Sequence, residues 1–256
     1  VVVYNMPGLS FREFIQFETQ INLPVYSLEE IVKNHIAIAI AITQKLKPLQ
    51  YFDNYLNYGY YPFYIENKKS FHQKLSEVIL TVLEVDIPQY AAISVSNGVL
   101  LKKLLSVISN SVPFKPNMNA ISERTGISLN TMKNYLKLLH DAQLLQLLYV
   151  EDKGMNTLGK PEKIFLNNPN LITNLGIDLD KGSIRETFFL NQMQYQQPVF
   201  ASANVDFKVA DFEFEVGGRN KKKKQIQGIA NAFVVKDDVE IGSDLNIPLW
   251  LFGFLY

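Results

Sequence analysis

The sequence contains no cysteine. Disulfide bonds and thiolate metal sites are therefore excluded, and the composition fits a reducing cytoplasm. Long hydrophobic runs are also missing, since an apolar stretch such as 36–42 is far shorter than the roughly 20 residues that cross a bilayer. We expect a cytoplasmic protein with no membrane partner.

Neither sign of charge is in excess, because 25 Lys and Arg residues balance 25 Asp and Glu residues. Any affinity for nucleic acid must then come from local patches. A hydrophobic content of 47% is typical of a folded globular chain. Histidine is scarce, and the wide separation of His35, His72 and His140 argues against a zinc site or a catalytic triad.

The sequence also lacks a phosphate-binding loop. The segment Gly154–Lys160 has the right spacing, but Pro161 stands where such a loop needs a magnesium-binding hydroxyl, and no helix follows. We interpret this segment as the tip of a wing and expect no nucleotide site in it. The chain also opens without an initiator Met, inside the apolar run Val1–Tyr4, so we predict a fragment of a longer protein.

The front of the chain favours short helices with tight turns. Ser27 and Glu30 have the spacing of a capping box, which predicts a helix over about 28–47. Two further helices are predicted at about 50–56 and 70–83, and the aromatic-rich turn between them is expected in the core. Together they are typical of a small helical subdomain.

The densest local signal is a helix-turn-helix pattern at 119–136. Gly126 can take the left-handed conformation at the turn, and Ser128 can cap the second helix. Strands predicted at 144–150 and 163–166 complete a winged helix. The residues expected to contact a DNA groove lie on the outer face of the second helix and are Asn130, Thr131, Lys133, Asn134 and Lys137. Many winged helices bind proteins instead, so that alternative stays open.

The last third of the chain alternates between helix and strand, which predicts an α/β (α+β) fold with a mixed sheet. The predicted elements are a helix at 183–194, strands at 199–201, 205–209 and 212–216, a basic helix from about Lys221, a strand at 232–235 and a buried terminal strand within 248–255.

An ordered set of motifs resembles the C-terminal part of a family of prokaryotic AAA-type ATPases. These motifs are PGLSFREF at 7–14, YLNYGYYPFY at 55–64, the winged helix, KIFLNNPNL at 163–171 and FEVGGRNKKKKQI at 214–226. The resemblance implies three parts: the end of the ATPase core with a helical lid at 1–98, a winged-helix domain at 99–166 and a restriction-endonuclease-like domain at 167–256. It also implies an upstream core that uses ATP and magnesium, whereas this chain lacks the phosphate loop and is expected to bind no ATP.

A metal-dependent nuclease needs carboxylates for a divalent ion and a lysine beside them. The candidate catalytic residues are Glu186, Asp206 and Glu215. Asp206 and Glu215 would hold Mg²⁺ or Mn²⁺. In the fold that the resemblance implies, the three acids stand on the helix and on the second and third strands, and a lysine is expected two residues after the last acid. Gly217 stands there instead, and Lys221 or Lys222 would have to replace the lysine. The alternative is that the three acids are ordinary helix-face and strand positions.

A basic run adds a second candidate surface for nucleic acid. Its members are Arg219, Lys221, Lys222, Lys223 and Lys224. In the first turn of a helix such cations oppose the helix dipole, so an anion such as a nucleic-acid phosphate would stabilise them. The alternative is a solvated face whose lysine stems pack along the surface.

We therefore predict a nucleic-acid-engaging module, with duplex DNA as partner and an ATPase core upstream. Two alternatives remain: a protein-interaction module of the ATPase, and a divalent-metal-dependent nuclease. The sequence leaves the oligomeric state and the substrate undetermined.

Overall fold

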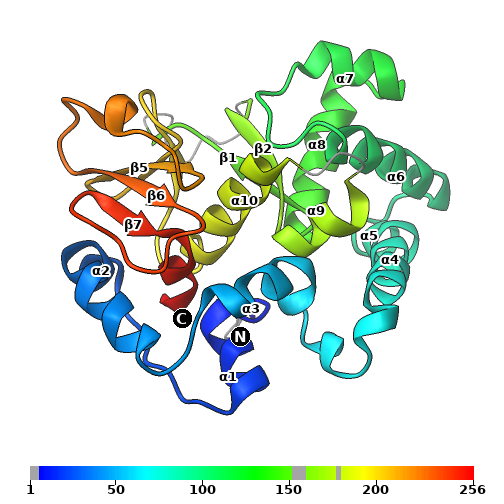
Figure 1. The fold of residues 1–256 in the computed structure, drawn as a ribbon. Helices are drawn as coiled ribbons and strands as arrows, with labels where there is room; N and C mark the ends of the chain where they lie inside the picture. The colour runs from blue at the N-terminus through cyan, green and yellow to red at the C-terminus, as the bar shows by residue number, and fades with distance from the viewer. Residues whose placement is uncertain (1–5, 152–159, 177–179) are drawn as a thin grey trace, which may run out of the picture.

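The computed structural model describes residues 6–151, 160–176 and 180–256. It has the mixed helical and sheet character that the sequence predicts, with a helical region on one side and a five-stranded mixed sheet on the other. Figure 1 shows the helix α10 (Lys181–Met193) between these two parts. The predicted wing tip at Gly154–Lys160 lies, except for its last residue, outside the described residues.

The front helices begin where the sequence predicts but end differently. Ser27 and Glu30 form the expected capping box, and the helix they start ends at Thr43, before the predicted end. Two of these helices continue into π-helical turns. The elements are α1 (Phe11–Thr19), α2 (Leu28–Thr43), α3 (Leu49–Asn54), the π-turn η1 (Tyr55–Gly59), η2 (Pro62–Ile65), η3 (Lys68–Ser70), α4 (Phe71–Thr81), the π-turn η4 (Val82–Asp86) and α5 (Ile87–Tyr90).

The helix-turn-helix and its hairpin are confirmed. Gly126 ends the first helix with a φ of 74°, which is the left-handed conformation that glycine adopts without strain. The Ser128 hydroxyl caps the second helix by accepting a hydrogen bond from the Thr131 amide at 3.3 Å. The elements are α6 (Val95–Ser109), α7 (Met118–Thr125), α8 (Leu129–Asp141), the antiparallel strands β1 (Leu145–Leu148) and β2 (Lys163–Leu166), and α9 (Pro169–Leu175).

The sheet has the strand order β3-β4-β5-β6-β7. Its first three strands are antiparallel, whereas β5, β6 and β7 run parallel. The strands are β3 (Phe200–Ala201), β4 (Phe207–Val209), β5 (Phe212–Gly217), β6 (Ala232–Lys236) and β7 (Asn246–Pro248). Helix α10 packs against β5, which gives the helix-on-sheet arrangement predicted for this part of the chain.

Two predicted elements of the last third are wrong. The basic run forms a turn followed by one short 3-10 segment, η6 (Lys223–Ile226), and not an α-helix. The apolar end is a buried 3-10 segment, η7 (Leu249–Phe254), and not a strand. A run that is apolar on every side has no periodicity to separate helical from extended structure.

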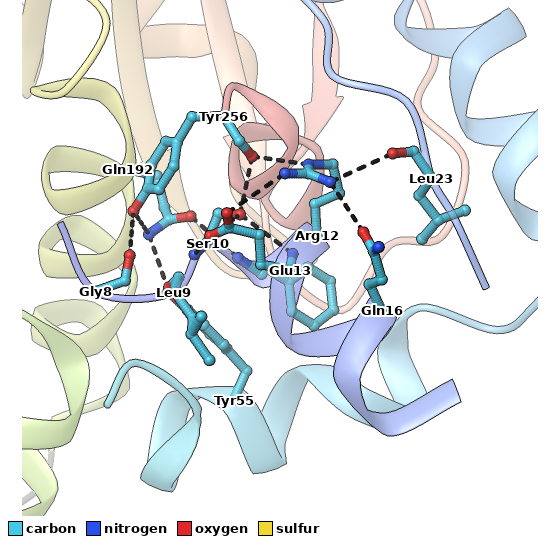
Figure 2. Close-up of polar contacts among 11 residues, drawn as sticks. Gly8, Leu9, Ser10, Arg12, Glu13, Gln16, Leu23, Tyr55, Gln192 and Tyr256 are labelled. Carbon is cyan, nitrogen blue, oxygen red and sulfur yellow. Dashed lines mark hydrogen bonds and ion pairs between the residues drawn. The ribbon is translucent and has the colours of Figure 1, made fainter. Parts of the chain in front are cut away.

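A buried polar network joins the two ends of the described chain (Figure 2). The Ser10 hydroxyl and the Arg12 Nε both donate to the main-chain oxygen of Tyr256, each at 2.9 Å. The Gln192 amide of α10 donates to the Tyr55 hydroxyl at 2.9 Å, and its oxygen accepts from the Phe11 amide at 3.2 Å. Helix α10 is therefore tied to the front helices as well as to the sheet.

One hydrophobic cluster runs through all three predicted parts of the chain, from Phe11 through Leu104 to Phe252. The division at 98 and 166 stays a prediction, since the shared core neither requires nor forbids it. Among the described residues, no helix is long and apolar enough to cross a membrane.

The Asn170 side chain on α9 holds the π-turn η1 in place. It is fully buried, donates to the main-chain oxygens of Tyr55 and Leu56 at 2.9 and 2.8 Å, and accepts from the Tyr60 amide at 2.9 Å. A π-turn departs from the regular helical bonding pattern, and this amide bonds the backbone groups at both of its ends.

We expect Asn170→Ala to lower the free energy of unfolding by about 3 kcal/mol, because three hydrogen bonds of about 1 kcal/mol each are lost in the interior. Asn57→Ala is the control, since the Asn57 side chain is exposed and, among the described residues, hydrogen-bonds only the Asp53 carbonyl. Urea denaturation of both variants measures the difference. Equal stabilities would contradict this role of Asn170.

Candidate active site at the junction of the winged helix and the sheet

The three predicted acids come from three elements and meet in one place. Glu186 lies on α10, Asp206 is the residue just before β4, and Glu215 lies within β5. Two lysines, Lys163 and Lys221, pair with them. We call these five residues the carboxylate–lysine cluster.

Lys163 was not among the predicted site residues, yet it joins two of the acids. Its Nζ lies 3.3 Å from Glu186 Oε2 and 3.3 Å from Asp206 Oδ1. Lys163 is the first residue of β2, so the winged helix contributes a side chain to the site of the sheet. Because 43 residues separate Lys163 from Asp206, no local sequence pattern could have revealed the contact.

Asp206 and Glu215 are held next to each other by the backbone of β5. Asp206 Oδ2 accepts a hydrogen bond at 2.9 Å from the amide of Val216, the residue that follows Glu215. The Glu215 side chain is only 3% exposed and forms an ion pair with Lys221. A carboxylate this deeply buried needs such a partner, since an unpaired buried charge is strongly unfavourable.

Gly217 explains how Lys221 reaches the site. A Cβ atom at position 217 would lie 2.7–2.9 Å from the Cβ, Cγ and Cδ atoms of Lys221. The Lys221 stem therefore lies against the Gly217 backbone, where any larger residue would collide with it. Lys221 extends from a turn and not from the predicted helix, and its ammonium group lies beside Glu215.

Aromatic packing fixes the elements that carry the cluster. The Phe207 ring stacks on Phe189 of α10 at 5.1 Å and contacts Phe165 of β2 at 5.9 Å between ring centroids. The Ala201 amide also donates to the Tyr149 oxygen at 2.8 Å, which joins the end of the hairpin to β3. The winged helix and the sheet thus share a packed junction beside the cluster.

Two carboxyl groups of the cluster, those of Glu186 and Glu215, have raised pKa values. Burial raises the pKa of Glu186 to about 7, the neighbouring carboxylates of Asp206 and Glu215 add to the rise, and Lys163 opposes it. Burial also raises the pKa of Glu215, against the opposing effect of Lys221. Perturbed carboxyl groups of this kind are typical of functional sites, although structural ion pairs produce them too.

A divalent cation is compatible with part of this donor set. No group of three or more His, Asp or Glu side chains in the described residues is arranged to hold a metal ion. Mg²⁺ is nevertheless commonly bound through one or two carboxylates, with water and substrate phosphate completing its coordination. Asp206 and Glu215, adjacent and rich in oxygen, meet that smaller requirement.

The predicted DNA-contacting face of α8 is exposed as expected at Asn130, Lys133, Asn134 and Lys137. Thr131 is half-buried, and its hydroxyl is hydrogen-bonded to Ser128 at 2.9 Å within the cap. Lys137 forms an ion pair with Asp141 one turn further along. This face therefore offers polar and basic groups to a partner.

Two residues of the basic run form ion pairs and the other three do not, among the described residues. Lys221 pairs with Glu215 and Lys223 with Asp244. Arg219, Lys222 and Lys224 are exposed and take part in no ion pair with the described residues. Only the latter three are free to meet an anionic partner without losing an existing ion pair.

We expect the stability of the protein to fall as pH rises from about 5 to about 8, and Glu186→Gln to reduce that fall. The folded-state pKa of Glu186, about 7, exceeds the ordinary value of about 4.3. The stabilisation from its bound proton is present in full below the unfolded pKa and is lost as pH rises through the folded pKa. Thermal melts of both proteins at the two pH values measure the effect.

Glu84→Gln is the matched control, because Glu84 is an exposed carboxylate paired with Lys102 on the surface. It should keep the wild-type difference between the two pH values. Glu215 titrates in the same direction, so Glu186→Gln should reduce the difference without abolishing it. An unchanged difference in Glu186→Gln would contradict the raised pKa.

A family model described as a domain of unknown function, DUF8612, matches residues 49–181. The matched part runs from α3 through the winged helix to the first residue of α10, so it includes Lys163 and ends before Glu186. No curated protein and no solved structure matches the chain. Since the match covers just over half of its 256 residues, this chain belongs to the DUF8612 family.

Proposed function

We propose that this chain engages nucleic acid and that its carboxylate–lysine cluster hydrolyses a phosphodiester with the help of a divalent cation. The observation that carries the proposal is the contact of Lys163 with Glu186 and Asp206. The strand β2 belongs to the winged helix and begins at the cluster with Lys163. A duplex seated on the winged helix would therefore have its backbone near the acids.

The residues that would hold the cation are Asp206 and Glu215. A cation bound there would polarise a phosphoryl oxygen and lower the pKa of a bound water. The Val216 amide orients Asp206 by donating to its Oδ2 at 2.9 Å. This bond fixes one carboxylate oxygen, so the rest of the group faces the cluster in a defined orientation.

The other members of the cluster supply charge and a proton. Lys221 offers an ammonium group beside Glu215, where negative charge on a phosphate would be stabilised. Glu186, with a pKa of about 7, is present at neutral pH in both its acidic and its ionised form. A group with that pKa can give or take a proton at its carboxyl oxygen near neutral pH.

The winged helix supplies the nucleic-acid contact in this proposal. Lys133 and Lys137 project from the exposed face of α8, and Lys160 lies exposed just before β2. Lysines of this kind bind phosphates without selecting a base sequence. Asn130 and Asn134 on the same face carry the amides that can recognise base edges.

The alternative, a protein-interaction module, has one observation in its favour. A largely apolar hollow lies between α5 and α8, and it is lined by Val82, Ile87, Tyr90, Leu138 and Ala142 together with the acids Asp86 and Asp141. The Tyr90 side chain is 84% exposed at its edge. No member of the carboxylate–lysine cluster is among the described residues that line this hollow, so binding of a protein there is compatible with the main proposal.

Coupling to an upstream ATPase core rests on the sequence resemblance alone and stays a prediction. The motif that carries the first part of that resemblance, at 7–14, lies partly within α1 and contributes Ser10 and Arg12 to the network around Tyr256. Any movement of that segment would therefore reach the last residues of the chain.

We expect the double variant Lys133→Ala with Lys137→Ala to bind duplex DNA more weakly than wild type, and the slope of log affinity against log salt to fall by about 2. The loss of two phosphate contacts is the physical reason. Fluorescence anisotropy with a labelled duplex at several salt concentrations measures it. The control is Lys45→Ala with Lys47→Ala, which removes two exposed lysines beyond the end of α2. Equal affinity of both double variants for duplex DNA would show that α8 is not part of the interface.

We expect wild type to cleave duplex DNA in Mg²⁺ or Mn²⁺, and Asp206→Asn or Glu215→Gln to lose at least about 100-fold in rate, since each removes a negative donor to the cation. Gel analysis of a labelled duplex follows the reaction. Asp244→Asn is the control, because Asp244 is an exposed acid whose ion-pair partner among the described residues is Lys223. A wild-type protein that binds DNA but cleaves none would refute hydrolysis and leave the binding intact.

A further inference from the structure

The Lys163 ammonium group lies between two acids that would otherwise repel each other. Its Nζ is 3.3 Å from each of Glu186 Oε2 and Asp206 Oδ1. The lysine side chain is 30% exposed, and its Nζ also lies 5.9 Å from the centroid of the Phe207 ring. The ring and the two carboxylates together define where this cation rests.

Lys163 contacts both carboxylates at the same distance, and that distance is long. Charge-assisted hydrogen bonds between an ammonium and a carboxylate are usually about 2.7–2.9 Å, so neither acid holds Lys163 at close range. An ammonium that is bound equally and weakly to two partners can be displaced from both at once. By contrast, the Val216 amide binds the other oxygen of Asp206 at 2.9 Å.

A divalent cation at Asp206 would compete with Lys163 for the same oxygen. Since Val216 takes Oδ2, the oxygen left for a cation is Oδ1, which faces Lys163. Mg²⁺ needs its oxygen ligands at about 2.0–2.1 Å, and two cations so near one carboxylate oxygen repel each other strongly. Occupation of Asp206 by one cation therefore disfavours the other.

We propose that Lys163 is an internal counter-cation, which neutralises Glu186 and Asp206 in the absence of a divalent cation and withdraws from them when the cation binds. This inference rests on the proposed function, since it presumes a cation at Asp206. It makes the winged helix a regulator of the site, because Lys163 belongs to β2. A phosphate of bound nucleic acid is the natural new partner for the released ammonium.

The inference is tested by the affinity of the full chain for Mn²⁺ without nucleic acid, measured by electron paramagnetic resonance of free Mn²⁺. We expect Lys163→Met to bind Mn²⁺ at least about tenfold more tightly than wild type, because the competing charge is gone. Lys163→Arg keeps the charge and should bind close to the wild-type level. Lys102 is a surface lysine of α6 that pairs with Glu84 of η4. Lys102→Met should bind Mn²⁺ with the wild-type affinity.

A second measurement uses the wild-type protein and so does not depend on how the variants fold. An amine-reactive reagent labels exposed lysines, and peptide mass spectrometry quantifies the label at Lys163. Saturating Mn²⁺ should increase labelling of Lys163 and leave Lys102 unchanged. Labelling of Lys163 that stays constant or decreases would overturn the inference.

The outcomes separate this inference from the proposed function. Equal or weaker Mn²⁺ binding by Lys163→Met, with clear binding by wild type, overturns the role of Lys163 and leaves the cation site standing. Absence of Mn²⁺ binding in wild type and in Lys163→Met overturns both the counter-cation and the cation-assisted hydrolysis. Tighter binding by Lys163→Met that Asp206→Asn abolishes supports the inference and identifies the shared ligand.

Discussion

The side chain of Gln192 is the contact on which the arrangement of this protein depends. Its oxygen accepts from the Phe11 amide, and its amide group donates to the Tyr55 and Tyr256 hydroxyls, so one residue of α10 bonds α1, η1 and the last residue of the chain. Buried amides must be satisfied, and a network satisfied on every side fixes one arrangement of its elements. Because Glu186 lies on the same helix, this network also sets the position of the cluster.

Electrostatic balance is the second constraint, and it links parts of the chain that are far apart in sequence. The three acids of the cluster cannot all be ionised in a buried place without counter-charges. Lys221 supplies one from the turn after β5, and Lys163 supplies the other from the winged helix. The winged helix and the sheet are thus one electrostatic unit, whatever their boundaries as domains.

Elements whose cause is local could be predicted from the sequence. The capping box at Ser27 and the left-handed turn at Gly126 act within a few residues, and both are present. The basic run was predicted as an α-helix but forms a turn and a short 3-10 segment, in which Lys221 and Lys223 pair with Glu215 and Asp244. The Lys223–Asp244 contact joins residues far apart in the sequence, so no local pattern indicates it. The three acids were found because the resemblance places acids on the helix and on the second and third strands of this part, whereas Lys163 was missed because only tertiary packing brings it near them.

The packing of Lys221 against Gly217 couples a backbone position to a buried charge. The resemblance predicts a lysine at position 217, whereas the ammonium group beside Glu215 belongs to Lys221. Glycine has no Cβ, so the Lys221 side chain can lie against the backbone of residue 217 and pair with Glu215. The glycine and the lysine therefore depend on each other: a larger residue at 217 would displace Lys221, and Glu215 would be left buried without its counter-charge.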